Sequence, residues 1–328
     1  MIERRLGANG PVVGAIALGC MGMSEFYEPV ADAGAIAAIQ RALELGVTLI
    51  DTSDMYGRGE NERLVGRALR DRRTAAVLAT KAGIVRSATD PTYRGLNGRP
   101  EYITAACDAS LERLGVEYVD LYYLHRADPK VPIEETLGAM HELVGAGKVR
   151  HLGVSELNAT TLRRAAAAAP LAALQSEYSL FTRDVETSGV LATAREFGIA
   201  LVAYAPLGRG ILTGAIRSTQ GLGEADLRRR VPRFDAGNFE RNLALVDAFA
   251  AIAAELGCTP AQLALAWLLA RGDDVVALPG SERVAHVEEN AGAAEVRLDA
   301  ATSARVDALF PRGAAAGSRL RDVRFVDR

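Results

Sequence analysis

Cysteine and histidine are scarce in this chain. Its 328 residues include three cysteines, Cys20, Cys107 and Cys258, and four histidines. An odd number of widely spaced cysteines forms neither a disulfide framework nor a zinc pattern, and the histidines show no metal-ligand spacing. The sequence therefore predicts a protein of a reducing, cytoplasmic environment without a resident metal ion.

A large charge of one sign and long hydrophobic runs are lacking as well. The net charge is −3 and no lysine-rich tail is present, so nucleic-acid binding has no electrostatic support. No stretch approaches the roughly 20 apolar residues of a membrane-spanning helix. The apolar run "PVVGAIALGC" has only ten residues and follows the turn-like "GANG". This pattern predicts a hairpin and then a strand, and neither a signal sequence nor membrane attachment.

Short apolar runs are what the chain has in quantity. Hydrophobic residues make up 49% of it and charged residues 24%, as in ordinary globular proteins. Eight runs are nearly continuous in hydrophobicity, which predicts parallel strands buried on both faces. They cover residues 15–19, 47–51, 76–81, 119–125, 150–155, 172–175, 200–205 and 274–280.

Segments with apolar residues at helical spacing separate these runs. The clearest are 32–46, 60–72, 104–115 and 132–147. We expect Asp32 and Gly46 to bracket the first of them, and Thr104 and Gly115 to bracket the third. Eight strands alternating with helices predict an α/β fold, a (β/α)8 TIM barrel that spans residues 1–328 as a single domain. The hairpin would precede the barrel, and a long loop over about residues 214–240 would follow strand seven.

A doubly wound nucleotide-binding sheet is the alternative. "GRGILTG" (208–214) comes near its glycine fingerprint, but the third glycine is one residue late and the segment follows the seventh strand. "GAGKV" (145–149) lacks the leading glycine and the Ser or Thr of a phosphate-binding loop. We therefore favour the barrel.

Chemically active side chains stand where the predicted strands end. In a TIM barrel the active site lies at the carboxyl ends of the strands. Asp51 ends strand two, Lys81 strand three and His125 strand four, while Tyr56 follows Asp51 by five residues. Each alone suits an ordinary structural role, but together on one rim they predict an active site. The next three strands end at Ser155 and Glu156, at Gln175 and at Tyr204.

These residues carry a resemblance to a known family. In the settings "DTSDMYG", "ATK" and "YYLHR", the four rim residues resemble the catalytic tetrad of the aldo-keto reductases. Further segments are similar in family order, among them "SLERLGVEYVDLYYLHR" (110–126), "VAYAPLGRGILTG" (202–214) and "ALPGSERVAHVEEN" (277–290). The resemblance runs from about residue 2 to residue 310. The opening "GCMGMSEFY" (19–27) looks most like the bacterial branch with pyridoxal-type and general aldehyde reductases.

The tetrad chemistry also follows from the residue types. A reductase that delivers hydride to a carbonyl carbon must give the oxygen a proton. A phenol with a pKa of about 10 is a poor acid at neutral pH unless a cation lies nearby. Lys81 would be that cation, held by Asp51, and Tyr56 would be the general acid in reduction and the base in oxidation. His125 would donate a hydrogen bond to the carbonyl oxygen.

The resemblance implies NADP(H) as cofactor and assigns its contacts. Ser155, Glu156 and Gln175 match residues that hold the nicotinamide carboxamide, and the ring of Tyr204 matches the one that stacks on the nicotinamide. Ser281 and Arg283 match residues at the 2′-phosphate, while Glu282 and His286 depart from the basic residues of many relatives. The implied contacts also include Gly19, Cys20, Met21, Ala205, Pro206, Leu207, Gly208, Arg209, Gly210, Glu289 and Asn290.

The substrate would be a small carbonyl compound or alcohol. We expect Met23, Phe26, Tyr27 and Tyr93 to line its pocket, which favours an apolar or aromatic substrate. We also expect the protein to be a monomer or a small homo-oligomer. Two other functions stay open. One is a regulatory nucleotide-binding subunit, since potassium-channel β subunits share this fold, although no inactivation segment precedes the hairpin. The other is a barrel isomerase or aldolase with Lys81 as Schiff base, which the adjacent Asp51 disfavours.

The segment after Pro311 departs from the family pattern. It reads "RGAAAGSRLRDVRFVDR". The composition favours a flexible, solvated tail, and the alternative is a segment folded across the pocket.

Overall fold

The computed structural model describes residues 1–87, 89–90, 93–321 and 326–327. Eight parallel strands form one sheet in the spatial order β12-β11-β10-β9-β8-β5-β4-β3. They are β3 (Leu18–Gly19), β4 (Leu49–Asp51), β5 (Val77–Ala82), β8 (Val119–Leu124), β9 (Val149–Ser155), β10 (Leu171–Glu177), β11 (Ala200–Tyr204) and β12 (Val275–Leu278). Each lies within or against a run predicted from hydrophobicity, so the predicted strands are confirmed.

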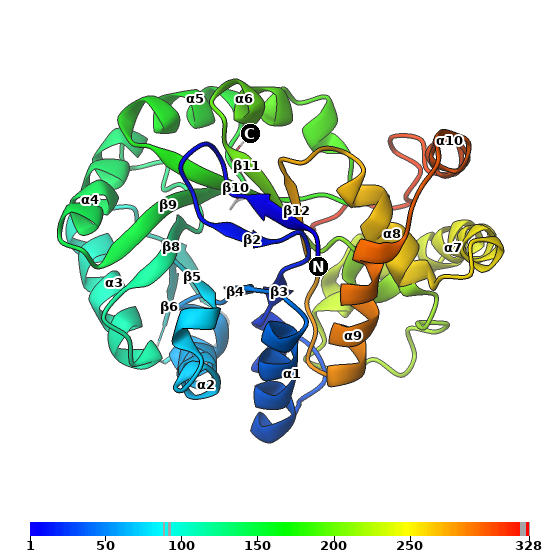
Figure 1. The fold of residues 1–328 in the computed structure, drawn as a ribbon, viewed down its shortest axis with the longest axis horizontal. Coiled ribbons are helices and arrows are strands. Elements are labelled where there is room, and N and C mark those ends of the chain that lie inside the picture. Colours follow the sequence, from blue (N-terminus) through cyan, green and yellow to red (C-terminus); the bar gives the residue numbers. More distant parts are fainter. Residues whose placement is uncertain (88, 91–92, 322–325, 328) are drawn as a thin grey trace.

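The sheet closes on itself. Backbone bridges join Ile16 to Ala277 and Gly19 to Gly280, in parallel orientation. The N–H of Gly19 donates to the carbonyl of Pro279 at 3.0 Å. Because the first and last strands pair in this way, the fold is the predicted (β/α)8 TIM barrel, with its strands surrounded by helices (Figure 1).

Ten α-helices occur in the described part of the chain. They are α1 (Asp32–Glu44), α2 (Glu60–Leu69), α3 (Pro100–Leu114), α4 (Ile133–Gly145), α5 (Ala159–Ala168), α6 (Val190–Glu196), α7 (Asn238–Glu255), α8 (Pro260–Leu269), α9 (Val284–Gly292) and α10 (Ala300–Leu309). Taken singly, none of the described helices is long and apolar enough to cross a membrane, and α7 and α8 meet the length and composition criteria only as a pair bent by 85°.

Two helix starts differ from the prediction. Helix α3 begins at Pro100, four residues before Thr104, which lies inside the helix. Proline suits the first helical turn because its φ is already helical and it has no N–H left unpaired there. Asp32 is the first residue of α1 and Ala31 its N-cap. Gly115 does end α3, at φ 67°, as predicted.

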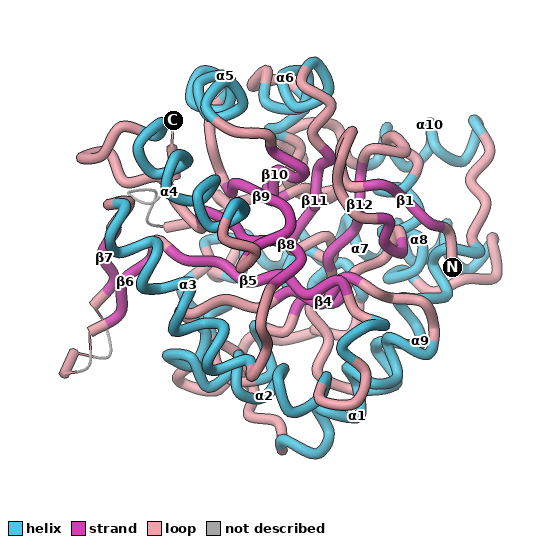
Figure 2. The backbone as a smooth tube through the Cα atoms, turned by 60° about the vertical axis from the view of Figure 1, so that its left-hand side comes forward, coloured by secondary structure: helices cyan, strands magenta, loops and turns pink. Residues whose placement is uncertain are grey.

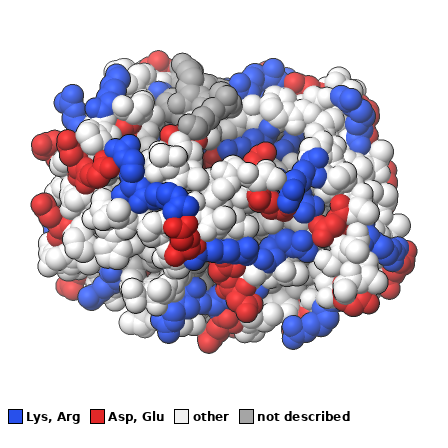
Figure 3. Space-filling view, turned by 90° about the horizontal axis from the view of Figure 1, so that it is seen from above, with Lys and Arg blue, Asp and Glu red and all other residues white. Residues whose placement is uncertain are grey.

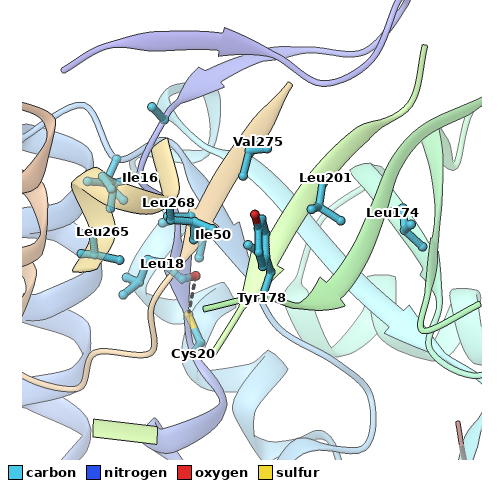
Figure 4. Close-up of a cluster of buried hydrophobic side chains, with 14 of the residues drawn as sticks. Ile16, Leu18, Cys20, Ile50, Leu174, Tyr178, Leu201, Leu265, Leu268 and Val275 are labelled. Carbon is cyan, nitrogen blue, oxygen red and sulfur yellow. Dashed lines mark hydrogen bonds between the residues drawn. The ribbon is translucent and has the colours of Figure 1, made fainter. Parts of the chain in front are cut away.

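Hydrophobic side chains fill two layers. One lies inside the barrel, where Leu6 and Val13 of the N-terminal hairpin pack with strand residues such as Leu121 and Val202. This hairpin, β1 (Glu3–Arg5) with β2 (Val12–Gly14), is the predicted one, and it lies across one end of the barrel (Figure 1). The other layer lies between strands and helices. Figure 4 shows part of it, with side chains from neighbouring strands beside Leu265 and Leu268 of α8.

Two connections bear on the site. A second hairpin, β6 (Ile84–Arg86) with β7 (Arg94–Leu96), was not predicted and projects beside α3 (Figure 2). The long connection after β11 is present as predicted, although short 3₁₀ helices at Leu227–Arg230 and Pro232–Phe234 interrupt it. The N–H of Leu227 donates to the carbonyl of Phe26 at 2.8 Å. This bond ties the connection to the loop after β3.

Gly153 tests the packing inside the barrel. A Cβ at this position in β9 would lie 2.4 Å from two ring carbons of Tyr123. We expect Gly153→Ala to lower the free energy of unfolding by about 1–3 kcal/mol, because the packed interior must shift. Urea unfolding measures this effect, as a lower midpoint for Gly153→Ala than for the wild-type chain.

Gly138→Ala is the matched control. Gly138 lies inside helix α4, and nothing lies within 4 Å of its added Cβ. Because alanine is favoured over glycine in helices by about 0.5–1 kcal/mol, this variant should be slightly stabilised. Equal midpoints for the two variants would contradict the described packing.

Candidate active site

Lys81 and Asp51 form a buried ion pair at the carboxyl ends of β4 and β5. The two strands are neighbours, and Asp51 pairs with Ala79 in their register. Lys81 Nζ donates to Asp51 Oδ1 at 2.5 Å and to the carbonyl of Thr52 at 2.7 Å. The Lys81 side chain is fully buried. A buried charge of this kind is tolerated only when it is paired and hydrogen-bonded.

The turn after β4 brings Tyr56 to the same ammonium. Lys81 Nζ lies 3.4 Å from the Tyr56 hydroxyl oxygen. The backbone N–H of Asp54 donates to the carbonyl of Lys81 at 3.2 Å, which fixes the turn on β5. A 3₁₀ helix then begins at Tyr56, and Gly57 within it has φ 53°, a conformation that glycine adopts readily.

The hydrogen bonds define the charges of this group. Lys81 has three acceptors, one for each N–H of an ammonium, and Asp51 accepts from Lys81 and, at 2.9 Å, from Gln175 Nε2. Burial lowers the pKa of Lys81, but Asp51 and Tyr56 outweigh burial and hold that pKa above its ordinary value. Burial raises the pKa of Tyr56, and the Lys81 charge opposes this rise without cancelling it. Tyr56 is therefore protonated at neutral pH.

His125 completes the group. It follows β8, and its backbone N–H donates to the backbone carbonyl of Ala82 at 2.8 Å. Its ring lies edge-on to the Tyr56 ring, with 5.9 Å between centroids. Burial, followed by the charges of Lys81 and Arg126, lowers the pKa of His125 well below its ordinary value. The imidazole is therefore neutral and has one N–H to donate.

A cavity of about 600 Å³ opens beside these side chains. Asp51, Tyr56 and His125 reach its wall, and Lys81 lies beneath it. Residues predicted to contact the cofactor form much of the rest of the wall: Gly19, Met21, Ser155, Gln175, Tyr204, Ala205, Pro206, Leu207, Arg209, Gly210, Arg283, Glu289 and Asn290.

These walls suit an anionic dinucleotide. Arg209 and Gly210 have positive φ, of 60° and 93°, in the turn after β11 that borders the cavity. Arg283 adds positive charge along the cavity, whereas Arg228, also in the wall, is paired with Asp226 at 2.6 Å. Glu282 and His286 also lie in the wall, so the two departures from the family pattern face the cavity beside Arg283.

Other predicted residues lie outside the cavity wall. Cys20 is fully buried, and its Sγ points to the carbonyl of Leu18 within the core (Figure 4). Ser281 does not line the cavity, but its Oγ accepts a hydrogen bond from Nδ2 of the lining residue Asn290 at 2.8 Å. Gly208 is buried in the turn after β11. Of the four residues expected around the substrate, Phe26 and Tyr27 line the cavity, while Met23 is in the core and Tyr93 is half exposed.

Glu156 is held by the C-terminal segment. Arg319 Nη2 donates to Glu156 Oε2 at 2.5 Å, and Arg319 Nη1 lies 3.6 Å from Glu177 Oε2. The backbone of Ala316 exchanges hydrogen bonds with the Asn242 side chain, and Leu320 reaches the cavity wall. Residues 311–321 thus fold against the barrel near the pocket. This arrangement differs from the solvated tail that the sequence favours and is nearer to the alternative, a segment folded across the pocket. Residues 322–325 and 328 lie outside the described part of the chain.

Comparison with known proteins agrees with this geometry. Residues 15–310 match the family model described as the aldo/keto reductase family. The chain belongs to the aldo/keto reductase family. It is 46% identical, over 303 residues, to aldo-keto reductase yakc of Schizosaccharomyces pombe, whose name includes NADP(+); the match covers 91% of this chain and 88% of the relative.

Solved structures of aldo/keto reductases and related enzymes superpose on the barrel. A glycerol dehydrogenase from Gluconobacter oxydans shares 32% identity with a TM-score of 0.85, and the match covers 94% of each chain. An aldo/keto reductase from Klebsiella pneumoniae, solved with NADP and acetate, shares 28% identity with a TM-score of 0.74 over 98% of this chain and 99% of the other.

The buried ion pair makes a prediction about stability. Lys81→Met leaves Asp51 buried without its cation, so we expect the free energy of unfolding to fall by about 3–5 kcal/mol. Adding Asp51→Asn removes the orphaned charge and should restore part of that loss. Urea unfolding of the two single variants and the double variant measures this coupling. Additive losses would contradict the described pair.

Proposed function

We propose that this chain is an NADP(H)-dependent oxidoreductase that reduces aldehydes or ketones to alcohols, with Tyr56 as general acid. One observation carries the proposal. A fully buried ammonium, Lys81, contacts both a carboxylate and the hydroxyl of a protonated tyrosine, and the tyrosine faces a cavity beside a neutral histidine. A proton donor, a cation that stabilises its conjugate base and a second hydrogen-bond donor are what carbonyl reduction requires.

The cofactor assignment rests on the cavity and on the relatives. The wall that runs from Tyr204 to Asn290 fits a dinucleotide, the Schizosaccharomyces pombe relative is named with NADP(+), and a Klebsiella pneumoniae structure contains NADPH. Ser155 and Gln175 would hold the nicotinamide carboxamide, Tyr204 would stack on its ring, and Arg283 would meet the 2′-phosphate. When bound, the reduced cofactor supplies a hydride to the carbonyl carbon.

The residues of the chain supply the rest of the reaction. His125 donates a hydrogen bond that polarises and orients the carbonyl oxygen. Tyr56 gives its phenolic proton to that oxygen as negative charge develops there. Lys81 stabilises the resulting phenolate, and Asp51 keeps Lys81 charged and in place. In alcohol oxidation the same phenolate takes the proton back.

The cavity wall indicates the class of substrate. Phe26, Met55 and Ile84 line the cavity, and the Phe26 and Tyr56 rings lie edge to face at 6.4 Å. Tyr27 lines it beside Arg228, whose guanidinium lies 5.2 Å from the ring centroid. These side chains favour apolar or aromatic carbonyl compounds.

The face of the molecule seen in Figure 3 carries positive and negative side chains interspersed with one another. It shows no broad basic surface of the kind that nucleic acids require.

A carbonyl substrate screen tests the proposed function. NADPH absorbance is followed with a panel of aldehydes and ketones, and NADH is run in parallel. We expect turnover with aromatic or apolar aldehydes. Nucleotide binding without turnover on any member of the panel would favour the regulatory-subunit alternative.

Tyr56→Phe tests the proton donor. The substitution removes the acidic proton and keeps the packed ring. General acid catalysis contributes typically 10²–10⁴-fold, so we expect carbonyl reduction to fall by about that factor while NADPH binding stays nearly unchanged. Steady-state kinetics and fluorescence titration measure the two effects. A rate within about threefold of wild type would exclude Tyr56 as the acid.

Arg283→Ala tests the phosphate contact. Arg283 is the N-cap residue of α9 and lines the cavity. A hydrogen bond to a charged group contributes roughly 1.5–3 kcal/mol, so NADPH affinity should fall about 10- to 150-fold, with little change for NADH. Equally weakened binding of both nucleotides would mean that Arg283 supports the loop instead.

Glu282→Lys removes a carboxylate from the same wall. It should tighten the binding of NADPH, more at low salt than at high salt.

A further inference from the structure

Ser53 links His125 to a carboxylate that the reaction described above does not use. Ser53 Oγ lies 3.1 Å from His125 Nδ1 and 3.1 Å from Asp54 Oδ1. It also accepts from the N–H of Met55 at 3.3 Å, and at 3.4 Å it has a longer contact with the carbonyl oxygen of Lys81, to which it could donate its proton. A hydroxyl has one proton and two lone pairs. Since Met55 takes one lone pair, one lone pair and one proton remain for His125 and Asp54.

Two arrangements of protons satisfy both of the shorter contacts, those at 3.1 Å to His125 and to Asp54. If Asp54 is ionised it can only accept, so Ser53 donates to Asp54 and accepts from a proton on His125 Nδ1. If Asp54 is protonated, it donates to Ser53 Oγ, and Ser53 donates to a bare Nδ1. A neutral imidazole has one N–H. The second arrangement therefore puts the histidine proton on Nε2, the nitrogen not bound to Ser53.

We propose that Asp54, acting through Ser53, selects the tautomer of His125 and is thereby a positioning residue for carbonyl reduction. The proposal rests on the proposed function, in which His125 donates a hydrogen bond to the carbonyl oxygen. With Nδ1 facing Ser53, only Nε2–H is available for that bond. The donor is present when Asp54 is protonated. It is absent when Asp54 is ionised, because the proton then lies on Nδ1.

The surroundings of Asp54 place this change near neutral pH. Burial, followed by repulsion from the Glu62 carboxylate of α2, raises the pKa of Asp54 to about 7. Arg113 of α3 opposes the rise, but it is held by Glu62, with Nε 2.6 Å from Glu62 Oε2. Among the residues that the structure describes, the other titratable groups that face Asp54 are the phenols of Tyr102 in α3 and Tyr122 in β8. Burial raises the pKa of each phenol, so both stay neutral.

The proton balance gives a direction for the pH dependence. As pH rises through the pKa of Asp54, the carboxyl releases one proton to solvent, the Ser53 hydroxyl turns to Asp54, and the proton of His125 passes from Nε2 to Nδ1 by exchange with water in the cavity. His125 stays neutral throughout. The rate of carbonyl reduction should fall by up to about tenfold per pH unit above the inflection and then level off. Loss of one such donor typically lowers the rate 10²–10³-fold.

Nitrogen NMR of ¹⁵N-histidine-labelled protein reads the tautomer directly. The four histidines allow His125 to be assigned by comparison with His125→Gln. In wild type we expect the signals of Nδ1 and Nε2 to exchange character between pH 6 and pH 8.5. In Asp54→Asn the amide group donates to Ser53 Oγ at every pH, so the Nε2–H form should persist and the inflection in the reduction rate should disappear.

Two further variants separate the relay from general effects. Ser53→Ala removes the bridge and should also abolish the pH-dependent exchange of tautomers. Asp128→Asn makes the same chemical change three residues after His125, where the carboxylate accepts from the N–H groups of Gly98 and Lys130. It should leave the exchange as in wild type.

The outcomes distinguish this proposal from the proposed function. A His125 tautomer that is constant in wild type, or that changes in Asp54→Asn as it does in wild type, would overturn the relay. The spectra need no turnover. A chain that shows the predicted exchange of tautomers but reduces no carbonyl compound would support the relay and contradict the proposed function.

Discussion

The buried contact between Lys81 and Asp51 is the interaction on which the rest of the site depends. One ammonium joins the end of β4, the backbone carbonyl of Thr52 in the following turn and the hydroxyl of Tyr56. An ion in a packed interior is costly unless each of its hydrogen-bonding groups is satisfied. The barrel meets this requirement because two neighbouring strands present their ends in register and Gln175 of β10 supports the carboxylate from the opposite side.

Much of the site could be predicted from the sequence because the active-site side chains of a barrel stand at the carboxyl ends of its strands. Hydrophobic runs located the strand ends, and the carboxyl ends of parallel strands meet at one rim. The sequence alone therefore groups Asp51, Lys81 and His125, and it adds Tyr56 because that residue follows Asp51 by only five positions. The family resemblance then located the long cavity wall from Tyr204 to Asn290, most of which the structure brings together.

What could not be predicted depends on contacts between segments distant in sequence. Arg319 reaches Glu156 across 163 residues, and nothing in the polar C-terminal sequence distinguishes this arginine from its neighbours. Asp54 looks like an ordinary turn residue, and only the tertiary structure places it beside Ser53 and the buried Glu62. Tyr93 is predicted to line the substrate pocket, but it lies half exposed, just before strand β7. The sequence does not specify which way a loop side chain points.

The pH dependence of alcohol oxidation tests the role of the buried cation most directly. In the proposed mechanism Tyr56 is the base in this direction and must be ionised, so below its pKa the rate should rise about tenfold per pH unit. Lys81 lowers the pKa of Tyr56 more than Asp51 raises it. Lys81→Met, and the double variant with Asp51→Asn, should therefore displace the rate profile to higher pH. A profile that lost amplitude but kept its position on the pH axis would contradict the account.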